Sequence, residues 1–480
     1  MKGNGSRFLI VSVLGRGGDG GYQTLTFNVK LLSRRLNEKL GDKDIRGQGK
    51  LVSAELSRYL ASKGYNVTLA YLVTYSLIKS CGCEDDPSIE TKILNLIDHT
   101  LGPTLQELKD MGVEVKPIPV EWLGVCDNVS WEMNPDSIRL RLILELEEFL
   151  SRFRDSKDLM IIADTSIGLN AYIALLLDVV RVVTVAEMMR RLPEGNLELY
   201  MLTQEPVLPR ASVSNVNAFI LDLPVVAFAK MPLSYRDIQQ DLKVTRIVDG
   251  ETCPELRDEV IEFNKASKFE STLKSTLTEC LRLFNAVSNN APLYVAHMLT
   301  GTQSASLENK LHSLWSRLYT LLRKILKHKK CGESKVSTCV SANGYDTLRD
   351  TIISLSLCEG LVKLAQKHID KLESRQGFIS LESLGRFSEH VYRDIEERLK
   401  ANFALNRLLL SRDVRSLRRD LGIETGSELG DIRRNFFAHS GLARDVIDYQ
   451  VIEDRIYVRY RESRLNEIRS WLELDVRSLV

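Results

Sequence analysis

An arginine and a histidine five positions apart carry the strongest chemical signal in this sequence of 480 residues. Arg434 and His439 bound the segment Arg-Asn-Phe-Phe-Ala-His, in which Asn435 lies four residues before the histidine. An imidazole titrates near neutral pH and can take or give a proton, whereas a guanidinium stays charged and can bind two phosphate oxygens. Because RNA supplies its own 2′-hydroxyl nucleophile, these groups could cleave it without a metal. The pattern predicts a ribonuclease site at Arg434, Asn435 and His439.

A structural interpretation of the same residues stays open, in which His439 caps an aromatic core and Arg434 lies on the surface. On an ideal helix, positions five apart differ in direction by about 140°, so one chain would not readily form a compact site. Two copies related by a two-fold axis would instead line one groove with both pairs. Arg323 and His328 have the same spacing within a lysine-rich segment, where we expect only a solvated helix face.

A glycine-rich loop follows the first apolar segment, and its glycines at 15, 17 and 20 match the dinucleotide-binding fingerprint. That fingerprint requires a helix after the loop and an acidic residue at the end of the next strand. Residues 22–29 instead alternate like a strand, and the next strand ends without an acid. An NAD or FAD site is therefore disfavoured, although the oxidoreductase alternative stays open. A phosphate-binding loop and a simple hairpin turn are the other interpretations.

A second polar loop runs from Asp164 to Asn170, between a buried apolar segment and an apolar helix. Asp, Thr and Ser could cap that helix, while Gly168 allows close approach of the backbone to a ligand. Two such loops leaving parallel strands would lie together at the ligand-binding edge of a sheet. Their coincidence favours a nucleotide-like ligand.

The elements around these residues indicate an α/β domain followed by a helical one, with the boundary near residue 235. Apolar runs of strand length alternate with amphipathic helices in the first part, which predicts a Rossmann-like, mostly parallel sheet covered on both faces. The predicted strands are 8–14, 66–74, 113–120, 159–164, 197–203 and 218–229, and the predicted helices are 51–63, 91–111, 135–153 and one from 171. Residues 236–480 are predicted to be helical over 255–288, 304–330, 345–373, 380–421 and 428–440, with a hairpin over 446–460 and a last helix from 465. The lysine-rich run 324–335 is expected to be a loop or a solvated helix end.

Composition limits the classes of partner. Basic and acidic residues number 65 and 64, for a net charge of +1, so a tight, salt-driven polyanion binder is disfavoured. Residues 401–480 contain arginines but no lysine, and acidic residues nearly balance them. This composition suits brief binding of RNA.

The eight cysteines are scattered and predict reduced thiols in a cytoplasmic protein without structural zinc. The N-terminus is expected to be a strand and not a signal peptide, and no membrane span is expected, because charges interrupt the longest apolar stretch.

Together these motifs resemble the CARF–HEPN ribonucleases of type III CRISPR systems. The resemblance rests on SVLGRGG at the end of the first strand with Tyr22 beyond it, on IIADTSIGLN, and on RRNFFAHSGL, whose spacing fits the R-x4-6-H rule of the family. It implies a CARF domain over 1–235 and a helical region with a HEPN domain over 236–480, and some relatives insert a helix-turn-helix, for which residues 236–300 have room. It also implies a homodimer or an assembly of dimers.

The family's activity is an expectation here. A cyclic oligoadenylate, most simply cyclic tetra-adenylate, would activate metal-independent cleavage of single-stranded RNA to 2′,3′-cyclic phosphate and 5′-hydroxyl ends, with no other cofactor. Ile167 stands where many relatives have His or another polar residue, which leaves the ring size and any degradation of the messenger open. The alternative is a CARF-type regulator that binds nucleic acid without cleaving it. The implied messenger-binding residues are Gly15, Arg16, Gly17, Asp164, Thr165, Ser166, Gly168 and Asn170, and the implied catalytic residues are Arg434, Asn435 and His439.

Overall fold

A computed structural model describes most of the chain. The described residues are 6–15, 23–78, 88–121, 124–126, 129–132, 134–153, 156–166, 170–192, 195–206, 215–225, 231–300, 302–327, 329–331, 335–341, 343–399, 410, 412–413 and 431–474.

The first part of the chain forms an eight-stranded sheet with the order β3-β2-β10-β9-β8-β1-β4-β5. The pairings from β9 through β8, β1 and β4 to β5 are all parallel, and β2 pairs in parallel with β10. Only β9–β10 and β2–β3 are antiparallel among the described pairings of this sheet. The predicted mostly parallel sheet is therefore confirmed. Its strands are β1 (Ser6–Val13), β2 (Leu25–Leu31), β3 (Asp44–Gly49), β4 (Asn66–Thr74), β5 (Glu114–Val120), β8 (Asp158–Asp164), β9 (Asn196–Gln204) and β10 (Asn215–Asp222).

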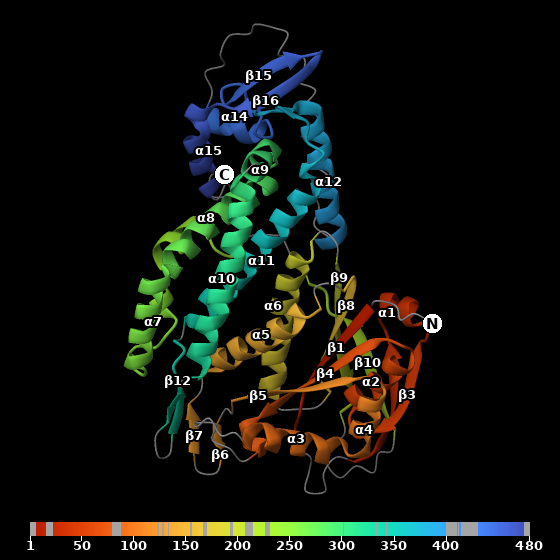
Figure 1. Ribbon diagram of the computed structural model, residues 1–480. Helices are drawn as coiled ribbons and strands as arrows, with labels where there is room; N and C mark the ends of the chain where they lie inside the picture. Colours follow the sequence, from red (N-terminus) through yellow and green to blue (C-terminus); the bar gives the residue numbers. More distant parts are fainter. Residues whose placement is uncertain are drawn as a thin grey trace.

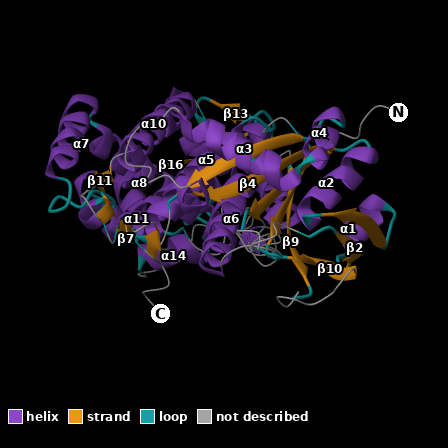
Figure 2. Ribbon diagram, turned by 90° about the horizontal axis from the view of Figure 1, so that it is seen from below, coloured by secondary structure: helices purple, strands orange, loops and turns teal. Residues whose placement is uncertain are grey.

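Helices cover both faces of the sheet, which explains why its central strands are apolar without interruption. In β1, Phe8 and Ile10 face one hydrophobic core, and Leu9 and Val11 face the other. The first core is closed by the helices α1 (Arg34–Leu40), α2 (Val52–Ser62), α3 (Ser88–Leu101) and α4 (Pro103–Asp110). The second is closed by α5 (Pro135–Ser151) and α6 (Asn170–Arg190), which lie between the sheet and the helical part of the molecule (Figure 2).

The helical part rises from α5 and α6 as a bundle, with the last hairpin at its far end (Figure 1). The second hydrophobic core continues without a break from the sheet into this bundle, so the two parts share one interior. The shared core explains why the helices α10 and α11 are apolar on the sides that meet α5 and α6. The bundle and its end contain α7 (Pro254–Ser267), α8 (Phe269–Ser288), α9 (Pro292–Leu299), α10 (Thr302–Lys327), α11 (Gly344–Ile369), α12 (Leu381–Leu399), α14 (Ile432–Ala438), β15 (Ile447–Ile452), β16 (Arg455–Tyr460) and α15 (Leu465–Glu473).

A buried ionic network also crosses between the two parts. Arg190 of α6 is ion-paired with Glu147 of α5, and its guanidinium lies 3.7 Å from a carboxylate oxygen of Glu359 on α11. The same guanidinium stacks 4.0 Å from the ring centroid of Trp315 on α10. Both Arg190 and Glu147 are almost fully buried. Four helices from the two parts of the chain therefore meet around one charged centre.

Several predicted boundaries are corrected by local backbone chemistry. The helix predicted over 91–111 is two helices, because Gly102 has a positive φ of 56° and Pro103 begins α4. The helix predicted over 255–288 is interrupted at Lys268, which also has a positive φ. The strand predicted over 218–229 ends at Asp222, before Pro224, and residues 226–230 lie outside the described part. The region 236–300 holds α7, α8 and α9, and a helix-turn-helix there stays a prediction.

The lysine-rich run 324–335 is more than the predicted loop or solvated helix end. It completes α10 at Lys327 and then forms β11 (Lys329–Cys331) and the start of β12 (Lys335–Thr338). The strand β12 pairs in parallel with β7 (Val129–Glu132), which in turn pairs with β6 (Gly124–Cys126). A strand from the second half thus completes a small sheet with strands from the first half. The predicted boundary at residue 235 therefore does not separate the chain into two non-interacting pieces.

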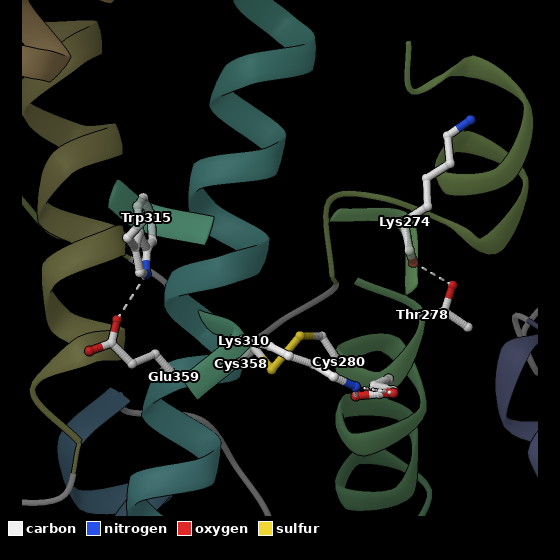
Figure 3. The surroundings of a disulfide bond; sticks show 8 residues. Lys274, Thr278, Cys280, Lys310, Trp315, Cys358 and Glu359 are labelled. Atoms are coloured by element: carbon white, nitrogen blue, oxygen red, sulfur yellow. Dashed lines mark hydrogen bonds and ion pairs between the residues drawn. A yellow bond between two sulfur atoms is a disulfide. The ribbon is translucent and has the colours of Figure 1, made fainter. Parts of the chain in front are cut away.

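Two disulfides correct the expectation of reduced thiols. Cys253 is bonded to Cys339, and Cys280 of α8 is bonded to Cys358 of α11, with Cα–Cα distances of 5.6 and 5.2 Å. Figure 3 shows the second bond between the two helices, beside the hydrogen bond from Trp315 Nε1 to Glu359. These partners are 86 and 78 residues apart in sequence, so only the tertiary fold brings them together. Among the described helices, none has both the length and the apolar character needed to cross a membrane.

Candidate ribonuclease site and ligand-binding edge

The Arg-x4-His motif lies on a short helix at the far end of the bundle (Figure 1). Asp431 caps α14 by accepting hydrogen bonds from the backbone N–H groups of Arg433 and Arg434, at 3.0 and 3.4 Å. This satisfies two of the unpaired donors at the helix start. The helix ends at Ala438, and His439 is its C-terminal cap with φ of −115° and ψ of 34°. His439 has therefore left helical geometry, and the 140° divergence of an ideal helix does not describe this pair.

An aromatic cluster fixes the buried side of the motif helix. Phe436 is fully buried and its ring lies 5.1 to 6.3 Å, centroid to centroid, from those of Phe437, Tyr460 and Trp471. Such contacts pack α14 against β16 and α15. The polar residues of the motif are left on the other sides of the helix, where Arg434 and His439 are exposed and Asn435 is half-buried.

A buried hydrogen-bond chain holds the turn directly after His439. Asn290 Nδ2 donates to Ser440 Oγ at 2.7 Å, and Ser440 Oγ donates to Asp413 Oδ2 at 2.5 Å. Ser440 has a positive φ of 53°, and its neighbour Gly441 one of 74°. A side chain at Gly441 would press on the Tyr460 hydroxyl, because a Cβ there would lie 2.9 Å from it. The position of His439 is thus set by groups that sequence patterns did not reveal, since Asn290 is 150 residues from Ser440.

The described surroundings of Arg434 contain no group that neutralises its charge. Among the described residues, no carboxylate lies within ion-pair distance of Arg434 or His439, whereas Arg323 of the second Arg-x4-His spacing is paired with Glu148 at 2.8 Å. The Arg323 pair fits the predicted solvated helix face, and its partner His328 lies outside the described residues. An exposed guanidinium without an acidic partner can bind a phosphate without first breaking an ion pair. The exposed imidazole of His439 can exchange protons with a ribose or a leaving oxygen.

The second candidate site lies where the ends of β1 and β8 meet. In the sheet, β4 and β5 lie on one side of β1, and β8 and β9 lie on the other, so the order of these strands reverses at the β1–β8 pair. Ligands of open α/β sheets bind at such points, outside the carboxyl ends of the strands. Gly15 follows β1, and Asp164 ends β8, as the sequence predicted. The loops after β1 and β8 therefore both begin at the carboxyl edge of the sheet, where the sequence predicted the ligand site.

Asp164 holds this edge together from inside. It is fully buried, and its carboxylate accepts hydrogen bonds from Ser12 Oγ at 2.8 Å, Ser166 N at 2.9 Å and Ser166 Oγ at 2.5 Å. Burial raises the pKa of Asp164, and the bonds from Ser166 and Ser12 oppose that rise. Thr165 donates its N–H and its hydroxyl to Leu202 O of β9. These hydrogen bonds position the start of the loop, where Thr165 and Ser166 are half-exposed.

Other predicted ligand residues differ in their surroundings. Asn170 is exposed at the first position of α6, and Gly15 is half-exposed. Arg16, Gly17 and Gly168 lie outside the described residues, as does Ile167. The glycine loop leads to the strand β2, which pairs with β10 and β3 and not with β1. The interpretation of the loop as a hairpin turn is therefore wrong. A dinucleotide fingerprint requires a helix after the loop, whereas the element here is a strand.

Comparison with known proteins places the motif within a characterised type of domain. The chain has an eight-stranded, mostly parallel α/β sheet joined to a helical bundle that ends in an exposed Arg-x4-His motif. Residues 387–462 match the family model described as "CRISPR system endoribonuclease Csx1, HEPN domain". This segment runs from α12 through α14 to the end of β16 and contains Arg434, Asn435 and His439. The match supports a CRISPR-associated HEPN ribonuclease acting on RNA. No curated protein sequence matches the chain.

Proposed function

We propose that this protein is a cyclic oligoadenylate-activated endoribonuclease of type III CRISPR defence, which cleaves single-stranded RNA without a metal. The observation that carries the proposal is the motif helix inside the HEPN-matching segment. There Arg434 and His439 are exposed and Asn435 is half-buried, and Arg434 has no acidic partner among the residues that the structure describes. These are the groups that transesterification of RNA requires: a positive charge for the phosphate and a proton carrier for the ribose and the leaving oxygen.

In the proposed reaction, the 2′-hydroxyl of a ribose attacks the adjacent phosphorus. His439 accepts the proton of that hydroxyl, and a protonated His439 gives a proton to the departing 5′-oxygen. Arg434 stabilises the negative charge on the phosphate oxygens. Asn435 supports the phosphate or the histidine from the same helix. The bond to the 5′-oxygen breaks, which leaves a 2′,3′-cyclic phosphate and a 5′-hydroxyl. In a homodimer, two motif helices would line one groove across the two-fold axis.

The activator is proposed to bind at the β1–β8 edge, with cyclic tetra-adenylate the simplest candidate. Supporting this, the edge is a strand-order reversal with a glycine-rich loop after β1, a polar loop after β8 and the exposed Asn170 beside them. The motif helix lies at the opposite end of the bundle (Figure 1), so activation would act at a distance. Linkage then requires that the messenger bind the active arrangement more tightly than the inactive one.

The decisive experiment is incubation of the purified protein with end-labelled single-stranded RNA in EDTA, with and without synthetic cyclic tri-, tetra- and hexa-adenylate. We expect cleavage in EDTA that one ring size strongly stimulates, with products that carry a 2′,3′-cyclic phosphate, and no cleavage of duplex RNA. Intact RNA with every ring would contradict the proposal, and so would cleavage that needs added Mg²⁺. Ligand-dependent binding of duplex DNA without RNA loss would favour the alternative of a nucleic-acid-binding regulator.

A further inference from the structure

A polar cavity of about 610 Å³ opens in the helical bundle between α8, α9, α10 and α15. Its volume falls within the range of about 300–1,000 Å³ that is usual for small-ligand sites. Six of its wall residues carry a charged group, a phenol or an imidazole. They are Glu279, Arg282, Tyr294, His297, Lys310 and Arg469.

Two of the three cations in the wall are paired with carboxylates. Lys310 Nζ lies 3.0 Å from Glu279 Oε1, beside the Cys280–Cys358 disulfide (Figure 3), and Arg282 is ion-paired with Glu473. These pairs hold α10 to α8 and α8 to α15. Lys310 and Arg282 therefore hold hydrogen-bond donors at fixed positions in the wall, but each ion pair adds little net charge to the cavity.

Arg469 is different, because it donates to a neutral amide. Its Nη1 donates to the amide oxygen of Asn466 at 3.2 Å. Among the described residues, no carboxylate oxygen lies within 4.0 Å of it. Next to it, burial and the charge of Arg469 lower the pKa of His297. The cavity therefore contains an unbalanced guanidinium charge.

The cavity is separate from the proposed cleavage surface. The ring of His297 lies 6.5 Å from that of Tyr460, and Tyr460 packs against Phe436 of the motif helix. On α15, Trp471 also packs against Phe436. This aromatic layer lies between the cavity and α14, whereas Arg434 and His439 are exposed to solvent. A ligand in the cavity would not contact the motif residues.

We infer that this cavity is a binding site for the phosphate group of a nucleotide-sized ligand, with Arg469 as its principal anchor and Lys310 and Arg282 as further donors. A guanidinium without an acidic partner favours a phosphate because it can donate two parallel hydrogen bonds to its oxygens. The remaining volume admits a nucleoside beside the phosphate. The ligand can be a free mononucleotide or the terminal phosphate of an RNA strand, since both present the same group.

Equilibrium dialysis of the full-length protein with radiolabelled inorganic phosphate tests the site. We expect saturable binding that weakens about 10- to 100-fold in Arg469→Gln, in line with the loss of a charged hydrogen bond, and less in Arg469→Lys, which keeps the charge. Arg464→Gln is the matched control, because Arg464 is paired with Glu467 at 2.8 Å on the same stretch of chain and is not among the cavity-lining residues. Competition by AMP identifies a mononucleotide site, and competition only by a 5′-phosphorylated 2′-O-methyl oligonucleotide identifies a strand end.

Two results would overturn the inference: phosphate binding that does not saturate, or an Arg469→Gln protein that binds phosphate as well as the unaltered protein. A melting curve without phosphate shows whether each variant is folded. If Arg469→Gln does not fold, Arg469→Lys and Lys310→Gln are compared instead, and unchanged affinity in both would equally refute the site. Because the readout is binding and not RNA cleavage, failure of this site leaves the ribonuclease proposal intact.

Discussion

The hydroxyl of Ser12 on β1 donates a 2.8 Å hydrogen bond to the buried carboxylate of Asp164 at the end of β8. Their backbones are also register partners across the β1–β8 pair. Since these strands lie at the point where strand order reverses, this contact joins the two segments from which the proposed messenger loops leave the sheet. A change at one loop can therefore move the other.

Asn170 offers the cleanest test of the messenger site, because it is exposed and Asp164 is not. Asn170→Ala should raise the messenger concentration for half-maximal RNA cleavage by about tenfold, the loss of one hydrogen bond, with the same maximal rate. Asp164→Ala should shift the curve in the same direction and also lower the free energy of unfolding, since it removes the loop anchor. Activation curves and urea unfolding measure the two effects. An unchanged curve for Asn170→Ala would remove this residue from the pocket.

The cleavage motif predicts that Arg434→Ala and Arg323→Ala have different effects on RNA cleavage, with loss of activity only in the first. His439→Ala should lower the rate of RNA cleavage by about 10²- to 10⁴-fold, the usual contribution of a general acid or base, and Arg434→Ala should also impair it strongly. Messenger binding should survive, because these residues lie far from the sheet (Figure 1). Arg323→Ala is the control, since Arg323 has the same spacing to a histidine but is paired with Glu148. Cleavage that persists in His439→Ala would refute the site assignment.

Ser440 is expected to position His439 without touching the substrate. Ser440→Ala removes the hydroxyl that links Asn290 to Asp413, which should lower the free energy of unfolding by about 1–3 kcal/mol. We expect kcat for RNA cleavage to fall while KM changes little. Ser470→Ala provides a comparison, because this exposed serine bonds only the backbone of its own helix. Loss of stability with an unaltered kcat would show that the Asn290–Ser440–Asp413 hydrogen bonds stabilise the fold and do not position His439.

Local patterns in the sequence predicted much of this structure. The pattern of apolar residues placed β1, β4, β5, β8, β9, β10 and most helices, although it missed β3, α1 and the small sheet of β6, β7, β11 and β12. Glu453 and Asp454 formed the predicted hairpin turn with positive φ at both positions. The approach of Asp164 to the end of β1 followed from the rule for parallel strands. Distant contacts were not predictable in this way. Cys280 and Cys358, or Asn290 and Ser440, are related only by how helices pack, and a helix face does not specify its partner in the sequence.

Glu55 predicts a pH dependence of stability at the edge of the sheet. Its side chain is buried against Gly47 of β3, where an added Cβ would lie 2.8 Å from Glu55 Oε2. Burial raises the pKa of Glu55 to about 7, although the ion pair with Arg58 opposes this. The folded protein therefore holds the proton more tightly than the unfolded chain. The stability that this provides is present below about pH 4.5 and is lost as the pH rises through 7.

The matched variant is Glu55→Gln, which mimics the protonated side chain at every pH. Relative to this variant, the unaltered protein should lose on the order of 3 kcal/mol of unfolding free energy between pH 4.5 and pH 8. Urea unfolding of both proteins across this range measures the difference. A constant difference would show that Glu55 is ionised throughout and that its pKa is not raised.

The buried network at Arg190 should be a sensitive point of the joint between the sheet and the bundle. Arg190→Met removes the cation that faces Glu147, Glu187 and Glu359. Glu187 keeps its ion pair with Arg191 and Glu359 keeps that with Lys363, so the loss falls mainly on the buried carboxylate of Glu147. Breaking a buried pair from one side usually costs about 3–5 kcal/mol. We expect thermal unfolding at a clearly lower temperature than in Arg181→Met, a change at an exposed position of the same helix. Equal melting temperatures would mean that Arg190 contributes to the joint through packing on Trp315 and not through its charge.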